Sequence, residues 1–313
     1  MKKKPNTTKT QTDLFLSDTD LSPIKKRLID SSHDIAMNDA EGITYQHSVL
    51  CQVSLPYKKP GDSIRNWDRK QGNAVIALEA GRILNPTTNE FNNIGLPYGT
   101  KSRLILTHLN SEALKTGSPI IDVESSLTAF VKRLGIDGNG RDIRDIKGHL
   151  SRLSVTTIRL GFLLEGDHTL QVNTQLVKAL DIWFEKNERQ RVLWPSTIQL
   201  SDEYFNSLTK HAVPLDERAL AALSHSPMGL DVYSWLAQRL HRISSKQQFI
   251  TWAALKDQFG YNYNRMIDFK MAFREILIMV HSQYPDAKFD IDDTGMTLKN
   301  SPPPIGKRQF LVT

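Results

Sequence analysis

The chain has 313 residues, enough for two compact domains and a tail, because single hydrophobic cores usually stop growing below this length. It holds no run of about 18 apolar residues, and polar residues follow its basic start, so we expect neither a membrane span nor a secretory signal. A single cysteine excludes an internal disulfide and indicates a cytoplasmic protein, while the net charge of +6 favours an anionic partner such as nucleic acid.

Residues 1–42 are rich in Lys, Thr, Ser and Asp and poor in large apolar side chains, which predicts a disordered N-terminal tail. One short apolar segment interrupts it, with Gln11, Leu14 and Phe15. This spacing resembles the peptide by which many bacterial proteins bind the replicative sliding clamp. The resemblance implies that the clamp binds the glutamine amide while leucine and phenylalanine fill an apolar pocket. Thr12 stands where leucine is usual, and a chance match is the alternative.

Residues 43 to 93 have the pattern of β structure. Apolar and polar residues alternate over Ile43–Leu55, and a second β-type segment covers Asn73–Ile83. Between them Ser63–Lys70 is short and polar with Trp67 as its anchor, and Asn85–Asn93 is rich in turn residues. We expect these segments to form a β layer that packs against the helices that follow, and not a separate domain.

A set of three helical patterns follows the turn Gly95–Gly99. The patterns cover Lys101–Lys115, Ser125–Leu134 and Arg141–Leu153, and a β-rich run, Thr156–Leu163, comes after them. Three helices with a short turn between the last two, followed by a hairpin, are the order of a winged helix-turn-helix. The third helix would then be the one that contacts DNA.

The third helical pattern has two different faces at about 100° per residue. Its apolar stripe is made of Ile143, Ile146, Leu150 and Leu153. The opposite arc carries Arg141, Arg144, Lys147, Ser151 and Arg152, with Gly148 among them. Glycine is costly inside a helix unless the helix backbone must come close to a partner such as a phosphate, so this arc is predicted to contact the DNA groove or its phosphates. The alternative is a solvated helix in which Asp142 and Asp145 pair with its arginines.

The chain beyond the hairpin predicts a domain boundary. Leu170–Phe184 reads as strand or mixed structure, and the charged cluster Lys186–Arg191 then precedes Pro195. Charged residues with a nearby proline are typical of a boundary. The sequence therefore predicts a first domain at residues 43–188 and a second at residues 189–313.

The second half repeats the organisation of the first. Helical patterns cover Asp202–Lys210, Leu215–Ala222, Gly229–Ile243, Trp252–Phe259 and Arg265–His281. Strand patterns cover Ile198–Leu200, Phe249–Thr251, Ala287–Ile291 and Met296–Lys299, the last two joined by an Asp/Gly turn. The predicted fold class is α+β, with two winged helix-turn-helix domains in tandem after the tail.

The last helix carries residue types that read bases at its start. Asn262 and Asn264 suit adenine and Arg265 suits guanine by bidentate hydrogen bonding, while Lys270 and Arg274 share a face and would follow the DNA backbone. The alternative is that the two asparagines only make the turn. Tyr261 and Tyr263 of the same turn would bind phosphates or stack on bases. The alternative for Tyr263 is that it packs in the core.

Signatures of catalysis and of metal binding are missing from the sequence. It contains no phosphate-binding loop, no His-x-His pair and no Cys/His cluster. His149 has no second ligand or base in view and reads as a surface or interface histidine. We therefore expect no enzyme, no cofactor and no metal.

The block that begins Gly95-Leu96-Pro97-Tyr98-Gly99 and runs to Ile105, with Leu134-Gly135-Ile136 and the third helix behind it, resembles the plasmid-encoded RepA replication initiator family. The resemblance covers roughly residue 43 to the C-terminus. It implies a protein that binds repeated sequences (iterons) in double-stranded origin DNA, opens neighbouring A·T-rich DNA and recruits the host initiator, helicase and sliding clamp. It also implies an active form that is monomeric on the iterons and a homodimer, formed through the first winged helix, that serves autoregulation or inhibition. The alternative is a winged-helix transcriptional regulator without initiation activity.

Overall fold

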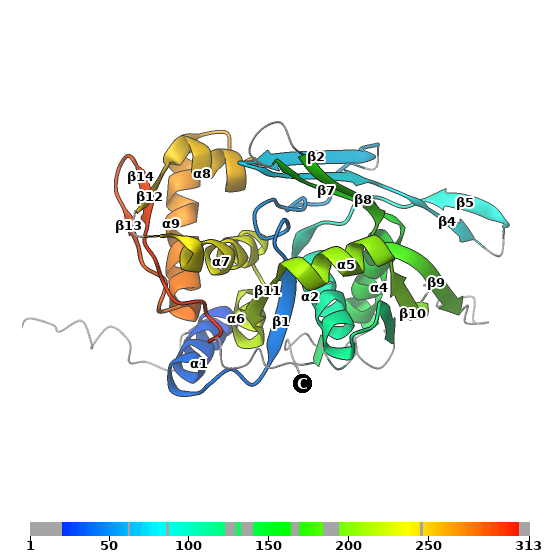
Figure 1. Cartoon of the computed structure of the whole chain (residues 1–313), viewed down its shortest axis with the longest axis horizontal. Coiled ribbons are helices and arrows are strands. Elements are labelled where there is room, and N and C mark those ends of the chain that lie inside the picture. Colours follow the sequence, from blue (N-terminus) through cyan, green and yellow to red (C-terminus); the bar gives the residue numbers. More distant parts are fainter. Residues whose placement is uncertain are drawn as a thin grey trace, which may run out of the picture.

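The computed structural model describes residues 21–306, with gaps at 62, 86–87, 123–128, 130, 133–139, 164–168, 184–193 and 245–246 (Figure 1). The predicted clamp peptide with Gln11, Leu14 and Phe15 lies outside the described residues. Most of the predicted helix Ser125–Leu134 also lies outside them.

The described chain is a mixed α+β structure with several small antiparallel sheets. The helices are α1 (Pro23–Met37), α2 (Gly99–Thr116), α4 (Gly140–Val155), α5 (Asp202–His211), α6 (Glu217–Leu223), α7 (Pro227–Arg239), the 3-10 helix η3 (Leu240–Arg242), α8 (Trp252–Phe259) and α9 (Met266–Gln283). The strands are β1 (Ile43–His47), β2 (Asn66–Gln71), β3 (Ala74–Glu79), β4 (Arg82–Asn85), β5 (Glu90–Asn93), β6 (Ile120–Asp122), β7 (Thr157–Leu163), β8 (Thr169–Gln175), β9 (Val177–Trp183), β10 (Trp194–Leu200), β11 (Ala212–Asp216), β12 (Gln248–Thr251), β13 (Phe289–Ile291) and β14 (Gly295–Leu298).

The segment from residue 21 to 42 differs from the predicted disordered tail, because it contains helix α1. Ser22 caps the helix by accepting a hydrogen bond from the N–H of Lys25, and Pro23 fills the first turn, where a missing N–H costs nothing. The helix packs against α6 and α9, buries Leu28, and receives a 2.9 Å hydrogen bond from the Gln283 amide to the Leu28 carbonyl. A short helix that packs on an existing core needs only a narrow apolar face. The overall composition of residues 1–42 does not reveal such a face, so it did not predict α1.

The predicted β layer forms, with different strand limits. The strand predicted over Ile43–Leu55 ends at His47, and the turn-rich segment contains β5, which pairs with β4 in a hairpin that extends from the body (Figure 1). Strands β2, β3, β7 and β8 form one four-stranded sheet in that order. Since β3 pairs with β7, the β layer and the hairpin after α4 belong to the same unit, as predicted.

The predicted boundary at residue 188 falls between two strands that pair with each other. Strand β10 pairs antiparallel with β9 on one side and with β6 on the other. Strand β1 pairs with β11, so a strand of the predicted first domain also pairs with a strand of the predicted second domain. The charged cluster itself lies outside the described residues.

Helix α2 confirms the predicted helix Lys101–Lys115. It packs against β1, α4, α5 and α7, so that most of its surface is buried. It ends at Gly117, whose φ of 62° is left-handed and whose N–H bonds back to Ala113. Helix α2 therefore contacts elements of both halves of the chain.

The helices and strands of the C-terminal part follow the predicted order, except that residues 212–216 form strand β11 where the sequence predicts the start of the helix Leu215–Ala222. Helices α8 and α9 pack beside a three-stranded sheet of order β12-β14-β13. Trp252 makes edge contacts with Phe269 and Phe273 at ring distances of 6.2 and 6.1 Å, and Phe259 lies 5.5 Å from Phe273. This aromatic core packs α9 against α8 through the inner face of α9.

Candidate nucleic-acid interface

Three members of the predicted apolar stripe of α4 lie on its packed side, and the side chain of Ile143 lies outside the described residues. Ile146, Leu150 and Leu153 are buried, and the helix packs against α2, β9 and β10. On the other side Arg141 and Arg144 are exposed. The remaining members of the predicted DNA-binding arc are half-buried, and they are Lys147, Gly148, Ser151 and Arg152.

The carboxylates near the start of α4 bind a residue of another helix. The Lys101 ammonium of α2 lies 3.3 Å from Asp142 and 3.1 Å from Asp145. Both acidic groups thus hold α4 on α2. Arg144 is exposed and forms no hydrogen bond or ion pair with another described residue. Its positive charge is available to an anionic partner.

Arg152 contacts the turn before α2. Its guanidinium lies 5.3 Å from the ring centre of Tyr98 and donates a 3.4 Å hydrogen bond to the carbonyl of Leu96. Gly95 permits this approach, because a Cβ there would lie 2.4 Å from a guanidinium nitrogen. Sequence reasoning placed Arg152 in the DNA-binding arc, whereas the structure shows that it also holds the Gly-Leu-Pro-Tyr-Gly turn against α4.

Gly148 lies on the outer side of α4 in open space. A Cβ built on it would meet no protein atom within 4 Å, so packing within the described chain does not require glycine there. Glycine inside a helix costs roughly 0.5–1 kcal/mol relative to alanine. The close approach of a partner to the helix backbone at Gly148 therefore stays a prediction.

His149 is buried between helices, which agrees with the interface alternative of the prediction and not with the surface one. Its Nδ1 lies 2.9 Å from the Ser102 hydroxyl, and its ring centre lies 4.7 Å from that of Tyr98. Burial, with a smaller contribution from the Arg152 charge, lowers the pKa of His149 to about 4. The histidine is thus neutral near pH 7 and joins α4 to α2 and to the turn before it.

The start of α9 presents polar side chains to solvent. Asn262, Asn264 and Arg265 are exposed, as reading of bases requires. The Arg265 guanidinium also binds the Asp268 carboxylate through two hydrogen bonds of 2.7 and 2.6 Å, an exposed pair that contributes little stability. Arg265 is therefore oriented by its neighbour while it remains accessible.

Lys270 and Arg274 of α9 contact the β13–β14 turn. Lys270 donates a 3.0 Å hydrogen bond to the Asp293 carbonyl, and the Arg274 guanidinium lies 3.8 Å from the Asp293 carboxylate. Both cations also lie near the Trp252 ring, at 5.2 and 5.3 Å from its centre. They share a face, as predicted, and they form the edge of α9 next to the hairpin.

The two tyrosines of the α8–α9 turn contact protein. Tyr263 makes an edge contact with Phe269 at 5.9 Å, which favours the core alternative for this residue. The Tyr261 hydroxyl accepts a hydrogen bond from the Tyr57 N–H, and its ring lies 5.1 Å from that of Trp67. Sequence reasoning did not foresee that the N-terminal unit binds this turn.

A joint forms where the β layer meets the α8–α9 turn. We use this name for Tyr57, Trp67, Arg69, Gln258 and Tyr261. The Arg69 guanidinium lies 4.7 Å from the Tyr261 ring centre and donates to the Asp257 carbonyl at 2.7 Å, and the Gln258 amide donates to the Gln52 carbonyl at 2.9 Å. The end of α8 and the start of α9 are therefore held against the N-terminal unit.

A buried ion pair joins α2 to α7 near the joint. Arg103 binds Asp231 at 2.7 and 2.9 Å and also donates to the carbonyls of Leu55 and Gly99 at 2.7 and 2.8 Å. Both charged groups are buried, and such a pair holds its partners strongly because loss of one leaves an uncompensated charge. Arg103 thus connects the Gly-Leu-Pro-Tyr-Gly turn to the C-terminal half.

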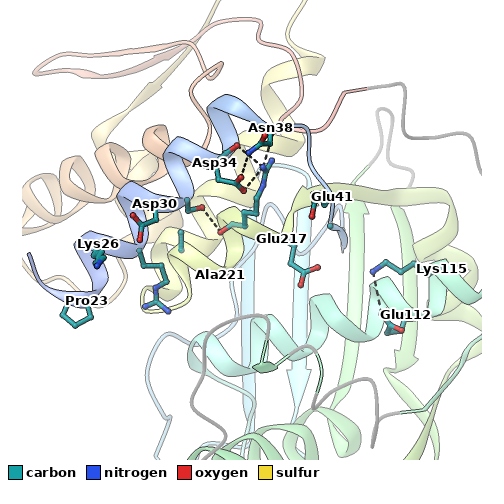
Figure 2. A pocket seen from close by; sticks show the side chains of 15 residues that line it. Pro23, Lys26, Asp30, Asp34, Asn38, Glu41, Glu112, Lys115, Glu217 and Ala221 are labelled. Carbon is teal, nitrogen blue, oxygen red and sulfur yellow. Dashed lines mark hydrogen bonds and ion pairs between the residues drawn. The ribbon is translucent and has the colours of Figure 1, made fainter. Parts of the chain in front are cut away.

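A hollow of about 1090 Å³ lies between α1, α6 and the end of α2 (Figure 2). Asp34 and Asn38 of α1 line it together with Glu217, and Glu112 and Lys115 of α2 lie across from them (Figure 2). Its charged lining mixes both signs with more carboxylates than cations, which does not suit a phosphate. Within the described residues there is no group of side chains placed to hold a metal ion. No described helix is long and apolar enough to cross a membrane.

Comparison with known proteins identifies a family. The model of the family described as plasmid-encoded RepA protein matches residues 96–254, just over half of the chain. This match contains the Leu96–Gly99 turn, α2, α4 and the start of α8, and it ends before α9. No curated protein matches the chain significantly.

Solved structures with a similar fold include crystal structures of domains 2 and 3 of RctB. One, of selenomethionine derivatives, has a TM-score of 0.50 at 12% identity and covers 81% of this chain and 98% of that chain. Another has a TM-score of 0.47 at 11% identity and covers 80% and 94%. The first match shows a shared fold across most of the chain.

Proposed function

Because the chain belongs to the plasmid-encoded RepA family, whose members are plasmid replication initiators, we propose that it binds repeated sequences (iterons) in double-stranded origin DNA through two winged helices in tandem. The observation that carries this proposal is the arrangement around α9. Helices α7, α8 and α9 and the sheet β12-β14-β13 have the order of a winged helix, with α9 in the place of the recognition helix.

The second winged helix supplies sequence reading in this proposal. Asn262, Asn264 and Arg265 are exposed at the start of α9, the end of a recognition helix that contacts base edges. Lys270 and Arg274 lie along its side next to the hairpin, where cations contact the phosphate backbone.

The first winged helix supplies phosphate contacts. Helix α4 presents exposed Arg141 and Arg144 beside Gly148, and two carboxylates of the same helix are bound by Lys101. The Lys101 charge offsets the negative charge of these carboxylates beside the arginines, which favours an anionic partner. We place the end of this unit beyond residue 188, because β10 pairs with β6 and β9.

Recruitment and assembly complete the proposed function. We propose that the protein acts in the cytoplasm, that the peptide with Gln11, Leu14 and Phe15 binds the sliding clamp, and that other surfaces recruit the host initiator and helicase. A homodimer through the first winged helix would serve autoregulation. Opening of the A·T-rich DNA would use bending and its low stability, with unwinding left to host ATPases.

Replication of a plasmid that carries only this gene and its upstream DNA tests the proposal. We expect replication, and we expect the purified protein to bind upstream direct repeats of about 20 base pairs, two helical turns. A protein that binds those repeats and controls transcription without supporting replication would instead be a winged-helix regulator. Absence of specific duplex binding would reject both.

The phosphate role of α4 has its own test. Arg144→Ala is expected to weaken binding to any sequence and to lower the slope of log affinity against log salt by about one. Lys178→Ala is a suitable control, because Lys178 is an exposed cation on β9 that pairs with Asp202 and lies outside the proposed interface. An equal slope for wild type and Arg144→Ala would remove α4 from the interface.

A further inference from the structure

The outward face of α9 is apolar, although α9 is the helix best placed to enter a groove. Ile267, Met271 and Ile278 are 64%, 64% and 72% exposed. Their spacing of four and seven residues places them in one stripe, opposite the buried Phe269 and Phe273. Three large apolar side chains in one exposed stripe mark an interaction surface more often than a surface meant for water.

The charges beside this stripe point to DNA as the partner. Lys270 and Arg274 lie along one edge of it, held next to the hairpin and over the Trp252 ring. On the other edge Asp268 is bound by Arg265, and Glu275 is exposed. A cationic edge next to an apolar stripe on a recognition helix matches a major groove, where phosphates border the base edges.

We propose that Ile267 and Met271 recognise thymine methyl groups in the major groove, so that α9 selects thymine by apolar contact. This inference rests on the proposed function and names the bases that α9 prefers. The C5 methyl of thymine is the apolar group of the major groove, and apolar side chains contact it. Burial of one such methyl group is expected to increase affinity about fourfold.

Ile278 differs from Ile267 and Met271 in its position along α9. Ile278 lies eleven residues after Ile267, which is about 16 Å further along the axis. Recognition helices contact bases with their N-terminal residues. Ile278 is therefore a matched control: it has the same side chain as Ile267, lies on the same face and is similarly exposed.

The test combines single side-chain changes with single methyl changes. The full-length protein selects duplexes from a randomised pool, and each thymine of a selected duplex is then replaced in turn by deoxyuridine, which lacks only the methyl group. For wild type we expect about fourfold weaker binding at one or more thymines. For Ile267→Ser or Met271→Ser we expect the same duplexes to lose that sensitivity, whereas Ile278→Ser keeps it.

Other results would overturn the inference in distinguishable ways. Specific binding with no effect of deoxyuridine at any position would reject methyl recognition and leave the proposed function standing. No enrichment of any duplex would reject the proposed function, and the inference with it. If Ile267→Ser and Ile278→Ser both abolish self-association in sedimentation and leave DNA binding unchanged, the stripe is a contact between two copies of the chain.

Discussion

His149 lies between α4 and the turn that precedes α2, where its ring contacts Tyr98 and Ser102. Its burial lowers its pKa to about 4, and burial also lowers the pKa of His47 to about 3. Both histidines are neutral in the folded protein at pH values at which they are protonated in the unfolded chain. Proton uptake by the unfolded state then favours unfolding as the pH falls.

Acid is expected to destabilise the protein between about pH 6.5, the pKa of an unfolded histidine, and pH 4. A folded-state pKa below the unfolded value means that stability is lost as the pH falls through this window. For His149 the loss between pH 7 and pH 5 is about 2 kcal/mol. We expect His149→Gln to lose less stability than wild type over this interval in urea denaturation. Equal losses would show that His149 does not titrate on unfolding.

Arg144 and Arg152 show how far the contacts of an arginine can be predicted from the sequence. Arg144 is exposed without a described partner, as the sequence predicts for a DNA-contacting residue. Arg152 belongs to the same predicted arc but contacts Tyr98 and Leu96. Helical spacing gives the direction of a side chain relative to its own helix. It does not reveal which other segment, distant in the chain, comes to lie there.

At the scale of the elements, α4 contains a helical glycine that packing does not require. Gly148→Ala is expected to stabilise the protein by roughly 0.5–1 kcal/mol, because the added Cβ meets open space. If a phosphate approaches the backbone here, the same change weakens DNA binding. Urea denaturation and duplex titration measure the two effects. Greater stability with unchanged affinity would show that no close approach occurs at Gly148.

Two N-terminal deletions test whether helix α1 contributes to stability. Removal of residues 1–18 is expected to leave stability and duplex binding unchanged, while clamp binding is lost if the Gln11 peptide is responsible. Removal of residues 1–38 is expected to destabilise the protein by several kcal/mol, since it exposes the surfaces of α6 and α9 that α1 covers. It also removes Asp34, which binds Arg218 at 2.9 Å. Thermal unfolding compares the two; equal melting temperatures would show that α1 contributes no stability.

At the scale of the whole molecule, the joint holds the α8–α9 turn against the β layer. Tyr261 is central to it, through the hydrogen bond from Tyr57 and the contacts with Trp67 and Arg69. Two DNA-binding units held in one relative position bind a complete site more tightly than either binds a half-site, because the second contact is intramolecular. The joint is thus expected to determine the spacing that the protein recognises.

Loosening the joint is therefore expected to affect complete and half sites differently. We expect Tyr261→Ala to weaken binding to a complete site by at least about tenfold and to leave binding to the half-site of α9 nearly unchanged. Tyr261→Phe keeps the ring contacts and is expected to retain most of the affinity. Gel-shift titrations with both duplexes give the comparison, and equal losses on the two would mean that Tyr261 supports α9 itself.

The local sequence pattern was sufficient to predict several helices and one hairpin of this protein. The periodicity of residues 101–115, 141–153 and 265–281 predicted α2, α4 and α9, and turn chemistry predicted the β13–β14 hairpin. The block from Gly95 to Ile105 indicated the family that comparison then identified. These features depend on residues close together in the chain, and their physical causes act over one or two helical turns.

The tertiary structure decided everything that depends on distant segments. It paired β1 with β11 and β9 with β10 across the predicted boundary, and it placed Arg103 on Asp231. It also placed Tyr261, which the sequence offers as a candidate phosphate ligand, in the joint, where it binds Tyr57. Such contacts follow from the burial of shared apolar surface and of charges that must find partners, which no local pattern in the chain encodes.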